Sequence, residues 1–167
     1  MTTEFREGTV HPMVAAALTA LGIEHEIVPC DPNFADTAEF CSKYGYPMET
    51  SANTIIVAST RGAKVHCACL VQASRRLDVN HTVKGLMGVS RASFATAAET
   101  KDLTGMEIGG VTVFGLPRDI PLYVDAAMMD QPYLIVGAGS RTAKVRLVPA
   151  EFAKIPNCTV IEGLSMA

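Results

Sequence analysis

The sequence predicts an α+β fold in a single domain over residues 1–167, with a mixed, mostly antiparallel, curled sheet and flanking helices. Three observations predict it. Helical and strand-like patterns are interspersed, two pairs of strand-like runs are joined by short turns, and no repeat or linker divides the chain. A doubly wound parallel sheet is the alternative. It fits less well, because the loops after residues 53–59 and at residues 137–140 are too short for crossover helices.

The first part of the chain predicts helix, strand and helix. Residues 11–21 carry apolar side chains at helical spacing, and Gly22 follows as a helix terminator. Residues 23–28 alternate as a strand does. Residues 37–44 read as a short helix with Asp36 as its N-cap.

The middle of the chain predicts a hairpin followed by two helices. Residues 53–59 and 64–71 are apolar runs separated by a turn, and they read as central strands covered on both faces. Asp78 is placed to cap a helix that continues through residues 84–87. A further helix is expected across residues 93–103.

The last part of the chain is rich in predicted strands. A second hairpin is expected, and a short helix with a proline at its start follows it. The predicted strands are residues 111–114, 122–124, 133–136, 144–147 and 160–161, and the helix is residues 149–153. The apolar residues 134–136 and Met128-Met129 fit either the core or a homodimer seam, and we favour the core.

Composition limits the class of protein. Hydrophobic residues make up 49% of the chain and charged residues 19%, which excludes a disordered acidic or basic chain. The formal net charge is −3, so contact with nucleic acid requires a local basic patch. No apolar run approaches the ~18 residues of a membrane span, and residues 1–12 lack the pattern of a signal peptide. We therefore expect a cytoplasmic protein.

The residues predict no metal and no cofactor. The four histidines have no HxH or HxxxH spacing, and the odd count of five cysteines favours free thiols. The chain has no P-loop. It also has no GxGxxG sequence between a strand and a helix, so a dinucleotide site is disfavoured.

Two glycine turns are the candidate functional loops. One contains Gly109 and Gly110 within residues 103–117, and the other is formed by residues 137–140. Glycine allows a backbone to approach another group closely, and such loops can aim N–H groups at an oxyanion, carbonyl or phosphate. A plain turn between core elements is the alternative, and the residues alone do not decide between the two.

Basic residues form a second candidate site. Arg75, Arg76 and Lys84 lie close together in the sequence, and with Arg141 and Lys144 they would make a patch for a phosphate backbone. Ordinary solvated surface is the alternative interpretation.

Taken in order, several motifs resemble the YbaK / prolyl-tRNA synthetase-associated domain family. The resemblance covers roughly residues 52–152. The matching motifs are Asn53-Thr54-Ile55-Ile56, Arg75-Arg76-Leu77-Asp78, Leu103-Thr104-Gly105, the stretch from Gly109 to Gly115, Val124-Asp125 and Gly137-Ala138-Gly139.

The resemblance implies an aminoacyl-tRNA deacylase, which hydrolyses the ester between a wrongly attached amino acid and the tRNA 3′ end. In this family a glycine loop supplies backbone N–H groups near the scissile carbonyl, and a ribose hydroxyl helps to position or activate water. The resemblance implies catalytic roles for Asn53 and Gly110. It implies substrate binding by Thr54, Gly109, Val111, Thr112, Gly115, Gly137, Ala138, Gly139 and Ser140.

The chain departs from the family pattern at several positions that matter for activity, which include Asn53, Val113, Gly137 and Lys144. Family deacylases usually carry lysine where Asn53 stands and proline where Val113 stands. Asparagine can donate a hydrogen bond, but it does not replace a positive charge. These departures predict altered specificity, with a small amino acid such as alanine, cysteine or serine as the target. A non-catalytic module that binds tRNA, a nucleotide or a protein partner is the alternative.

Overall fold

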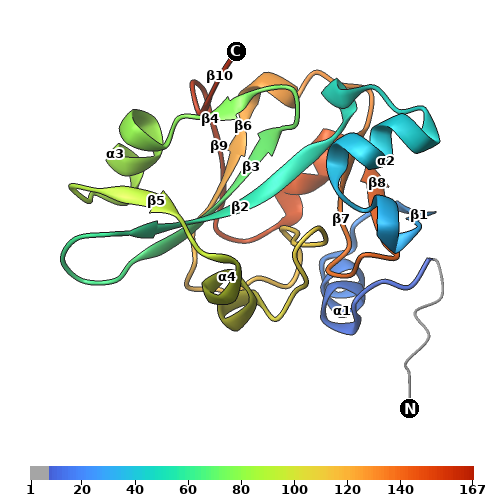
Figure 1. The fold of residues 1–167 in the computed structure, drawn as a ribbon, viewed down its shortest axis with the longest axis horizontal. Coiled ribbons are helices and arrows are strands. Elements are labelled where there is room, and N and C mark those ends of the chain that lie inside the picture. The colour runs from blue at the N-terminus through green and yellow to red at the C-terminus, as the bar shows by residue number, and fades with distance from the viewer. Residues whose placement is uncertain (1–7) are drawn as a thin grey trace.

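The computed structural model describes residues 8–167, so most of the segment in which we expected no signal peptide lies outside the described residues. Its main sheet has the strand order β5-β2-β3-β6-β9 (Figure 1). β2 pairs antiparallel with β3 and β5, whereas β6 runs parallel to β3 and β9. The strands are β2 (Ala52–Ser59), β3 (His66–Gln72), β5 (Ala92–Phe94), β6 (Leu122–Asp125) and β9 (Cys158–Ile161).

Two smaller sheets complete the strand structure. The antiparallel sheet β1-β8-β7 contains the second predicted hairpin, and β4 pairs with β10 near the C-terminus. Their bounds are β1 (Glu26–Pro29), β7 (Leu134–Gly137), β8 (Ala143–Leu147), β4 (Arg76–Leu77) and β10 (Ser165–Met166). The predicted fold class, a mixture of helices and mostly antiparallel sheet, is confirmed, and the strands are divided among three open sheets.

Short helices cover the sheets. The α-helices are α1 (Pro12–Leu21), α2 (Thr37–Tyr44), α3 (Lys84–Met87) and α4 (Ala97–Thr104). The remaining turns are η1 (Pro32–Phe34), η2 (Met48–Thr50), η3 (Val79–Val83), η4 (Ala126–Met128) and η5 (Pro149–Lys154). α1 and α2 begin and end where the sequence predicts, and each is closed by a glycine at positive φ, Gly22 and Gly45.

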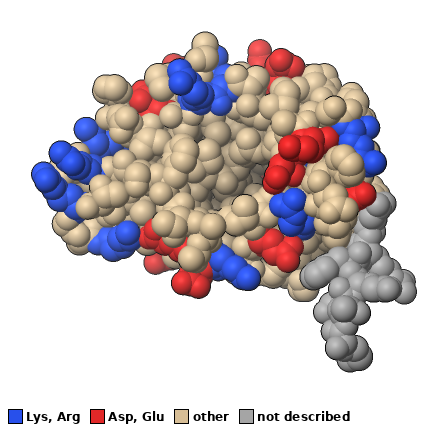
Figure 2. All heavy atoms as spheres, in the orientation of Figure 1, with Lys and Arg blue, Asp and Glu red and all other residues tan. Residues whose placement is uncertain are grey.

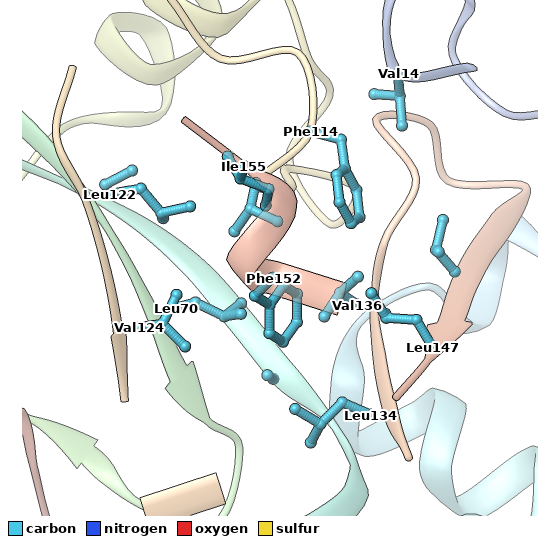
Figure 3. Close-up of a cluster of buried hydrophobic side chains, with 14 of the residues drawn as sticks. Val14, Leu70, Phe114, Leu122, Val124, Leu134, Val136, Leu147, Phe152 and Ile155 are labelled. Atoms are coloured by element: carbon cyan, nitrogen blue, oxygen red, sulfur yellow. The ribbon is translucent and has the colours of Figure 1, made fainter. Parts of the chain in front are cut away.

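The main core lies between the five-stranded sheet and the β1-β8-β7 sheet. Side chains of β3, β6 and β7 meet Phe152 of η5 and Phe114 of the loop after α4 (Figure 3). Leu134, Ile135 and Val136 are buried in the chain's own core, which accounts for their apolar character without a dimer. Burial of this kind is the main favourable term in folding.

A second cluster covers the opposite face of β2 and β3. It contains Val57, Leu77 and Leu164 together with Cys67 and Cys69, whose sulfur atoms lie 3.9 Å apart on one face of β3. No disulfide joins any of the five cysteines, all of which lie within the described residues.

Two predicted elements are wrong in detail. Residues 92–94 form strand β5 instead of the start of a helix, because they pair with the end of β2. Residues 111–114 form an irregular loop instead of a strand, although Val113 and Phe114 are buried in the core. The apolar pattern of residues 111–114 therefore reflects burial in the core and not pairing in a sheet.

No helix within residues 8–167 is long and apolar enough to cross a membrane.

Candidate active site

A cavity of about 310 Å³ opens between β2 and β7. Figure 2 shows the face of the molecule on which β2 lies in front, with a hollowed, largely uncharged centre. The walls come from β2, β7, β8, the start of α2, the segment between β5 and α4, and the loop after α4. Polar lining residues are Asp36, Thr37, Ser51, Asn53, Thr54, Thr100 and Lys144.

The cavity exists because β2 has a partly unpaired edge. On one side β2 pairs with β3 from Ala52 to Ala58, but on the other side β5 covers only Val57 to Ser59. β7 approaches the start of β2 through a single bridge, Ser51 to Ile135. Between that bridge and β5, the edge of β2 borders the cavity.

The backbone of Thr54 faces this open edge. The carbonyl of Ile56 accepts a hydrogen bond of 2.8 Å from the N–H of Ala95, on the β5 side. Backbone groups of a strand alternate between its two edges, so the N–H and C=O of Thr54 point to the same side. The side-chain Oγ1 of Thr54 is also buried, with no hydrogen-bond partner among residues 8–167. Thr54 therefore brings unused polar groups to the cavity.

The side chain of Asn53 is held by α2. Its Oδ1 accepts a hydrogen bond of 2.6 Å from Oγ1 of Thr37, the first residue of that helix. This contact fixes the carboxamide with Nδ2 available as a donor. The sequence placed Asn53 at the site but read Thr37 only as the start of a helix.

The two glycine turns lie against each other. The N–H of Gly139 donates a hydrogen bond of 2.6 Å to the carbonyl of Gly110, and the N–H of Glu107 donates one of 3.4 Å to the carbonyl of Gly139. A Cβ on Gly110 would lie 2.3 Å from the carbonyl oxygen of Ser140, and a Cβ on Gly137 would lie 2.5 Å from that of Val111. Glycine is needed here because two backbones are in contact.

These hydrogen bonds also limit which amides can face the cavity. The N–H of Gly110 donates to the carbonyl of Glu107 at 2.9 Å, and Gly110 does not line the cavity. Gly110 therefore supports the loop, whereas Gly109, Val111 and Gly137 line the cavity.

The other predicted substrate-binding residues lie outside the cavity lining. Ser140 is buried and donates a hydrogen bond of 2.5 Å to the carbonyl of Thr9, and the carbonyl of Ala138 accepts one from His11. Gly115 packs against Met13 of α1, and Thr112 is fully buried, with its N–H 3.4 Å from Sδ of Met106. These residues hold the loops in place.

Lys144 lies in the cavity wall and not on the surface. The residue is 6% exposed, and Nζ donates hydrogen bonds to the carbonyls of Ala35 at 2.6 Å and Gly109 at 3.2 Å. Burial lowers the pKa of this ammonium below its ordinary value. An ammonium has three N–H donors, so one is not used by these two carbonyls. The pocket thus holds a buried cation, supplied by β8.

Like Lys144, Arg141 links the segment at the start of α2 to the loop after α4, but it lies outside the cavity lining. Its guanidinium donates to the carbonyls of Pro32 at 2.9 Å and Ile108 at 2.9 Å, and it lies 3.3 Å from Oδ1 of Asp36. Asp36 is the N-cap residue of α2 as predicted, but its side chain makes no capping hydrogen bond. Arg141 and Lys144 together fasten the start of α2 to the glycine loop.

The predicted basic patch is divided between two places. Arg141 and Lys144 lie beside the cavity, whereas Arg75 and Arg76 belong to the β4–β10 end and Lys84 begins α3. Arg75 is engaged there, because its Nε donates to Oγ of Ser165 at 2.7 Å. The predicted single patch is therefore wrong, because the fold separates these basic residues into two groups.

Several cavity residues carried no recognisable signal in the sequence. Phe40 and Thr37 come from α2, Phe94 ends β5, Ala95 follows that strand, and Thr100 comes from α4. No sequence motif groups these residues, because their neighbours in the cavity are distant in the chain.

Comparisons with known proteins agree with this geometry. Residues 31–155 match the family described as the aminoacyl-tRNA editing domain. YwhH of Bacillus subtilis (strain 168) is 33% identical over 131 residues, which cover 78% of this chain and 81% of that protein.

Solved structures show the same fold. The crystal structure of hypothetical protein APE2540 matches with a TM-score of 0.82 and 25% identity, over 92% of this chain and 99% of that one. A structure described as a candidate trans-editing enzyme for prolyl tRNA synthetase matches with a TM-score of 0.79 and 23% identity, over 95% of this chain and all of that one.

The family match and the fold define the protein as an editing-type domain. The chain belongs to the aminoacyl-tRNA editing domain family. This membership confirms the resemblance seen in the sequence and supports a role of the tRNA-editing, deacylase type.

Proposed function

We propose that this protein hydrolyses the ester between a small amino acid and the 3′ end of a mischarged tRNA, with a specificity that differs from that of family members with lysine at position 53. The observation that carries this proposal is the cavity beside the unpaired edge of β2, into which Asn53, Thr54 and Lys144 bring polar groups. The trans-editing description of one structural neighbour points in the same direction. The reaction would take place in the cytoplasm, where charged tRNA is found.

The cavity suits a small amino acid. Its volume is about 310 Å³, and its apolar lining includes Phe40, Ile56 and Val136. The ester and part of the ribose must enter with the amino acid, which leaves little room for a large side chain. Alanine, serine and cysteine are therefore the expected amino acids.

The lining residues favour catalysis by positioning. No histidine, cysteine or tyrosine lines the described cavity. Its serine and threonine hydroxyls are not hydrogen-bonded to Asp36 or Lys144, whose partners among the described residues are Arg141 and two backbone carbonyls, so no lining hydroxyl is activated by an adjacent base. Nδ2 of Asn53, the N–H of Thr54 and the third N–H of Lys144 are donors for the carbonyl oxygen as it becomes an oxyanion. The carbonyl of Thr54 is an acceptor for the α-ammonium. Water attacks the ester carbonyl carbon, the bond from this carbon to the ribose oxygen breaks, and the proton lost by the water passes to that leaving oxygen. A neighbouring ribose hydroxyl of the substrate assists the water, as the family resemblance implies.

A non-catalytic binding module is the second candidate. It is favoured by the engagement of Lys144, whose ammonium already bonds two carbonyls, and by the loss of a lysine at position 53. In that case the cavity would bind the aminoacyl end without cleaving it.

The test is deacylation of a panel of tRNAs mischarged with alanine, serine or cysteine. We expect hydrolysis of at least one of them well above the buffer rate, and a loss of about 10- to 100-fold in Asn53→Ala. The matched control is Asn33→Ala, because Asn33 is exposed on η1 outside the cavity lining. If every ester persists at the buffer rate, the hydrolase proposal is wrong. Binding of the charged tRNAs without cleavage would then support the second candidate.

A further inference from the structure

Phe94 stands between the cavity and a second hollow. It lines both, and 56% of its surface is exposed although it is a large aromatic side chain. It lies at the end of β5, an edge strand of the five-stranded sheet. An exposed aromatic ring beside a proposed RNA site is a candidate surface for RNA binding, because unpaired bases stack on aromatic side chains.

The second hollow has a volume of about 400 Å³ and a mixed lining. Apolar surface comes from Phe94, Leu77 and Met166, the last of which is 42% exposed. Polar groups come from Asp78, Asn80 and His81. A nucleobase needs this combination, with an apolar surface for its face and polar groups for its edge.

Asp78 is fixed in a position to accept hydrogen bonds. Its Oδ1 lies 3.2 Å from Nδ1 of His81, and its Oδ2 accepts a hydrogen bond of 3.1 Å from Oγ1 of Thr82. A carboxylate can accept more than one hydrogen bond at each oxygen. The exocyclic amino groups of cytosine and adenine are donors that such a carboxylate accepts.

Basic residues lie at the same end of the molecule as Phe94. Arg91 lies just before β5, and its carbonyl accepts a hydrogen bond from the N–H of Thr60 at the β2–β3 turn. This turn also carries Arg61 and Lys64, of which Lys64 forms an ion pair with Glu99 at 3.1 Å. Figure 2 shows Lys and Arg gathered at the left end, where that hairpin lies in Figure 1. Arg76 pairs in register with Met166 beside the second hollow. A phosphate backbone that passes Phe94 would therefore meet cations.

We propose that Phe94 and the second hollow bind nucleobases of the single-stranded tRNA 3′ end, next to the cavity that receives the ester. The identity of this RNA rests on the proposed function. Phe94 supplies the stacking face, and Asp78 accepts from an exocyclic amino group. Phe94 is thus a binding residue for the nucleotide part of the substrate, separate from the groups that act on the ester.

The kinetic test compares two substrates of the full-length protein, an alanyl-tRNA and alanine ethyl ester, which has no nucleotide. Phe94→Ala should raise KM for alanyl-tRNA by about 5- to 100-fold, the range expected for the loss of one base–aromatic stack, and should change KM for the ethyl ester by a much smaller factor, because that ester has no base to stack. Phe94→Trp should restore the low KM. Val160→Ala is the matched control, because Val160 is 47% exposed on β9, the opposite edge strand of the same sheet.

A binding test remains decisive even if no ester is hydrolysed. The chain contains no tryptophan, so Phe94→Trp introduces a single fluorescent reporter. Its emission should be quenched by the trinucleotide CCA and not by ribose 5-phosphate, and Val160→Trp should respond to neither. The proposal is overturned if the emission of the Phe94→Trp variant does not change with CCA, or if Phe94→Ala affects both substrates equally. Inactivity of the parent on every ester, with CCA still quenching, would refute the hydrolase function and keep the base-binding site.

Discussion

The N–H of Gly139 donates a hydrogen bond of 2.6 Å to the carbonyl of Gly110, so the two glycine turns form one unit. This contact places β7 and the loop after α4 against each other on one side of the cavity. The shape of the cavity therefore depends on backbone contact between two loops that are distant in the chain. The residues at this contact must be glycines, because a side chain would keep the two backbones apart.

Gly110→Ala tests this dependence. The new Cβ would lie 2.3 Å from the carbonyl oxygen of Ser140, so the loops must separate. We expect a loss of about 1–3 kcal/mol in the free energy of unfolding, typical of overpacking, together with loss of ester hydrolysis. Denaturant unfolding measures the first quantity. Gly85→Ala is the control: Gly85 lies in α3 with nothing within 4 Å of a Cβ, so this change should leave stability unchanged or raise it. Equal behaviour of the two variants would contradict the role given to the loop contact.

The sequence predicted most elements because their signals are local. Gly22 closes α1 and Gly45 closes α2, and both hairpins follow from apolar runs around short turns. β5 was missed because its strand character comes from pairing with Val57 to Ser59, which a local pattern does not contain. Residues 111–114 were wrongly predicted as a strand, because a buried loop and a buried strand can have the same apolar composition.

The sequence predicted part of the candidate site, again where the signal is a local motif. Asn53 and Gly109 stand within motifs that the family resemblance marks, and the structure places both in the cavity lining. Lys144 was predicted to belong to a basic patch for a phosphate backbone, whereas here two carbonyls accept hydrogen bonds from its ammonium inside the cavity wall. Hydrogen bonds between distant segments decide such cases, and no local pattern reports them.

Thr37→Val tests whether α2 positions Asn53. The variant keeps the shape of the side chain but removes the 2.6 Å hydrogen bond to Oδ1 of Asn53. We expect kcat for a hydrolysed aminoacyl-tRNA to fall about tenfold and the free energy of unfolding to fall by about 1 kcal/mol. Thr37→Ser keeps the donor and should restore kcat. If serine and valine at this position give the same kcat, the hydrogen bond does not position Asn53.

Glu99→Gln tests how α4 is anchored beside the cavity. Oε2 of Glu99 lies 2.8 Å from Nε2 of His66 and 3.1 Å from Nζ of Lys64, which ties α4 to the β3 end of the hairpin. The hydrogen bond with His66, and then that with Lys64, lowers the pKa of this carboxyl. The ionised form is therefore favoured in the folded state, so Glu99 contributes stability above the ordinary carboxyl pKa of about 4.3 and loses it as pH falls through the lower folded pKa. Thermal unfolding of both proteins between pH 7 and pH 2 should show their melting temperatures converging at the acid end. A constant difference across that range would contradict this account.

Lys144→Met tests the buried cation. The variant removes hydrogen bonds to the carbonyls of Ala35 and Gly109, but it also removes the cost of burying an ammonium, so the free energy of unfolding at pH 7 should change by no more than about 2 kcal/mol. Ester hydrolysis should fall about 100-fold, as for the loss of one oxyanion donor. Lys101→Met, an exposed change on α4, should affect neither quantity.

The same variant gives a pH dependence with a definite sign. Burial lowers the pKa of the Lys144 ammonium in the folded state, whereas the unfolded chain keeps the ordinary lysine value of about 10.4. Between these two values the unfolded chain binds more protons than the folded protein, so the stability of the parent relative to Lys144→Met should rise as pH increases through that window. Denaturant unfolding of both proteins from pH 7 to pH 10 measures the difference, in which contributions of the other titrating groups cancel. A relative stability that falls with pH would mean that the ammonium is stabilised in the wall, and that the two carbonyl hydrogen bonds outweigh its desolvation.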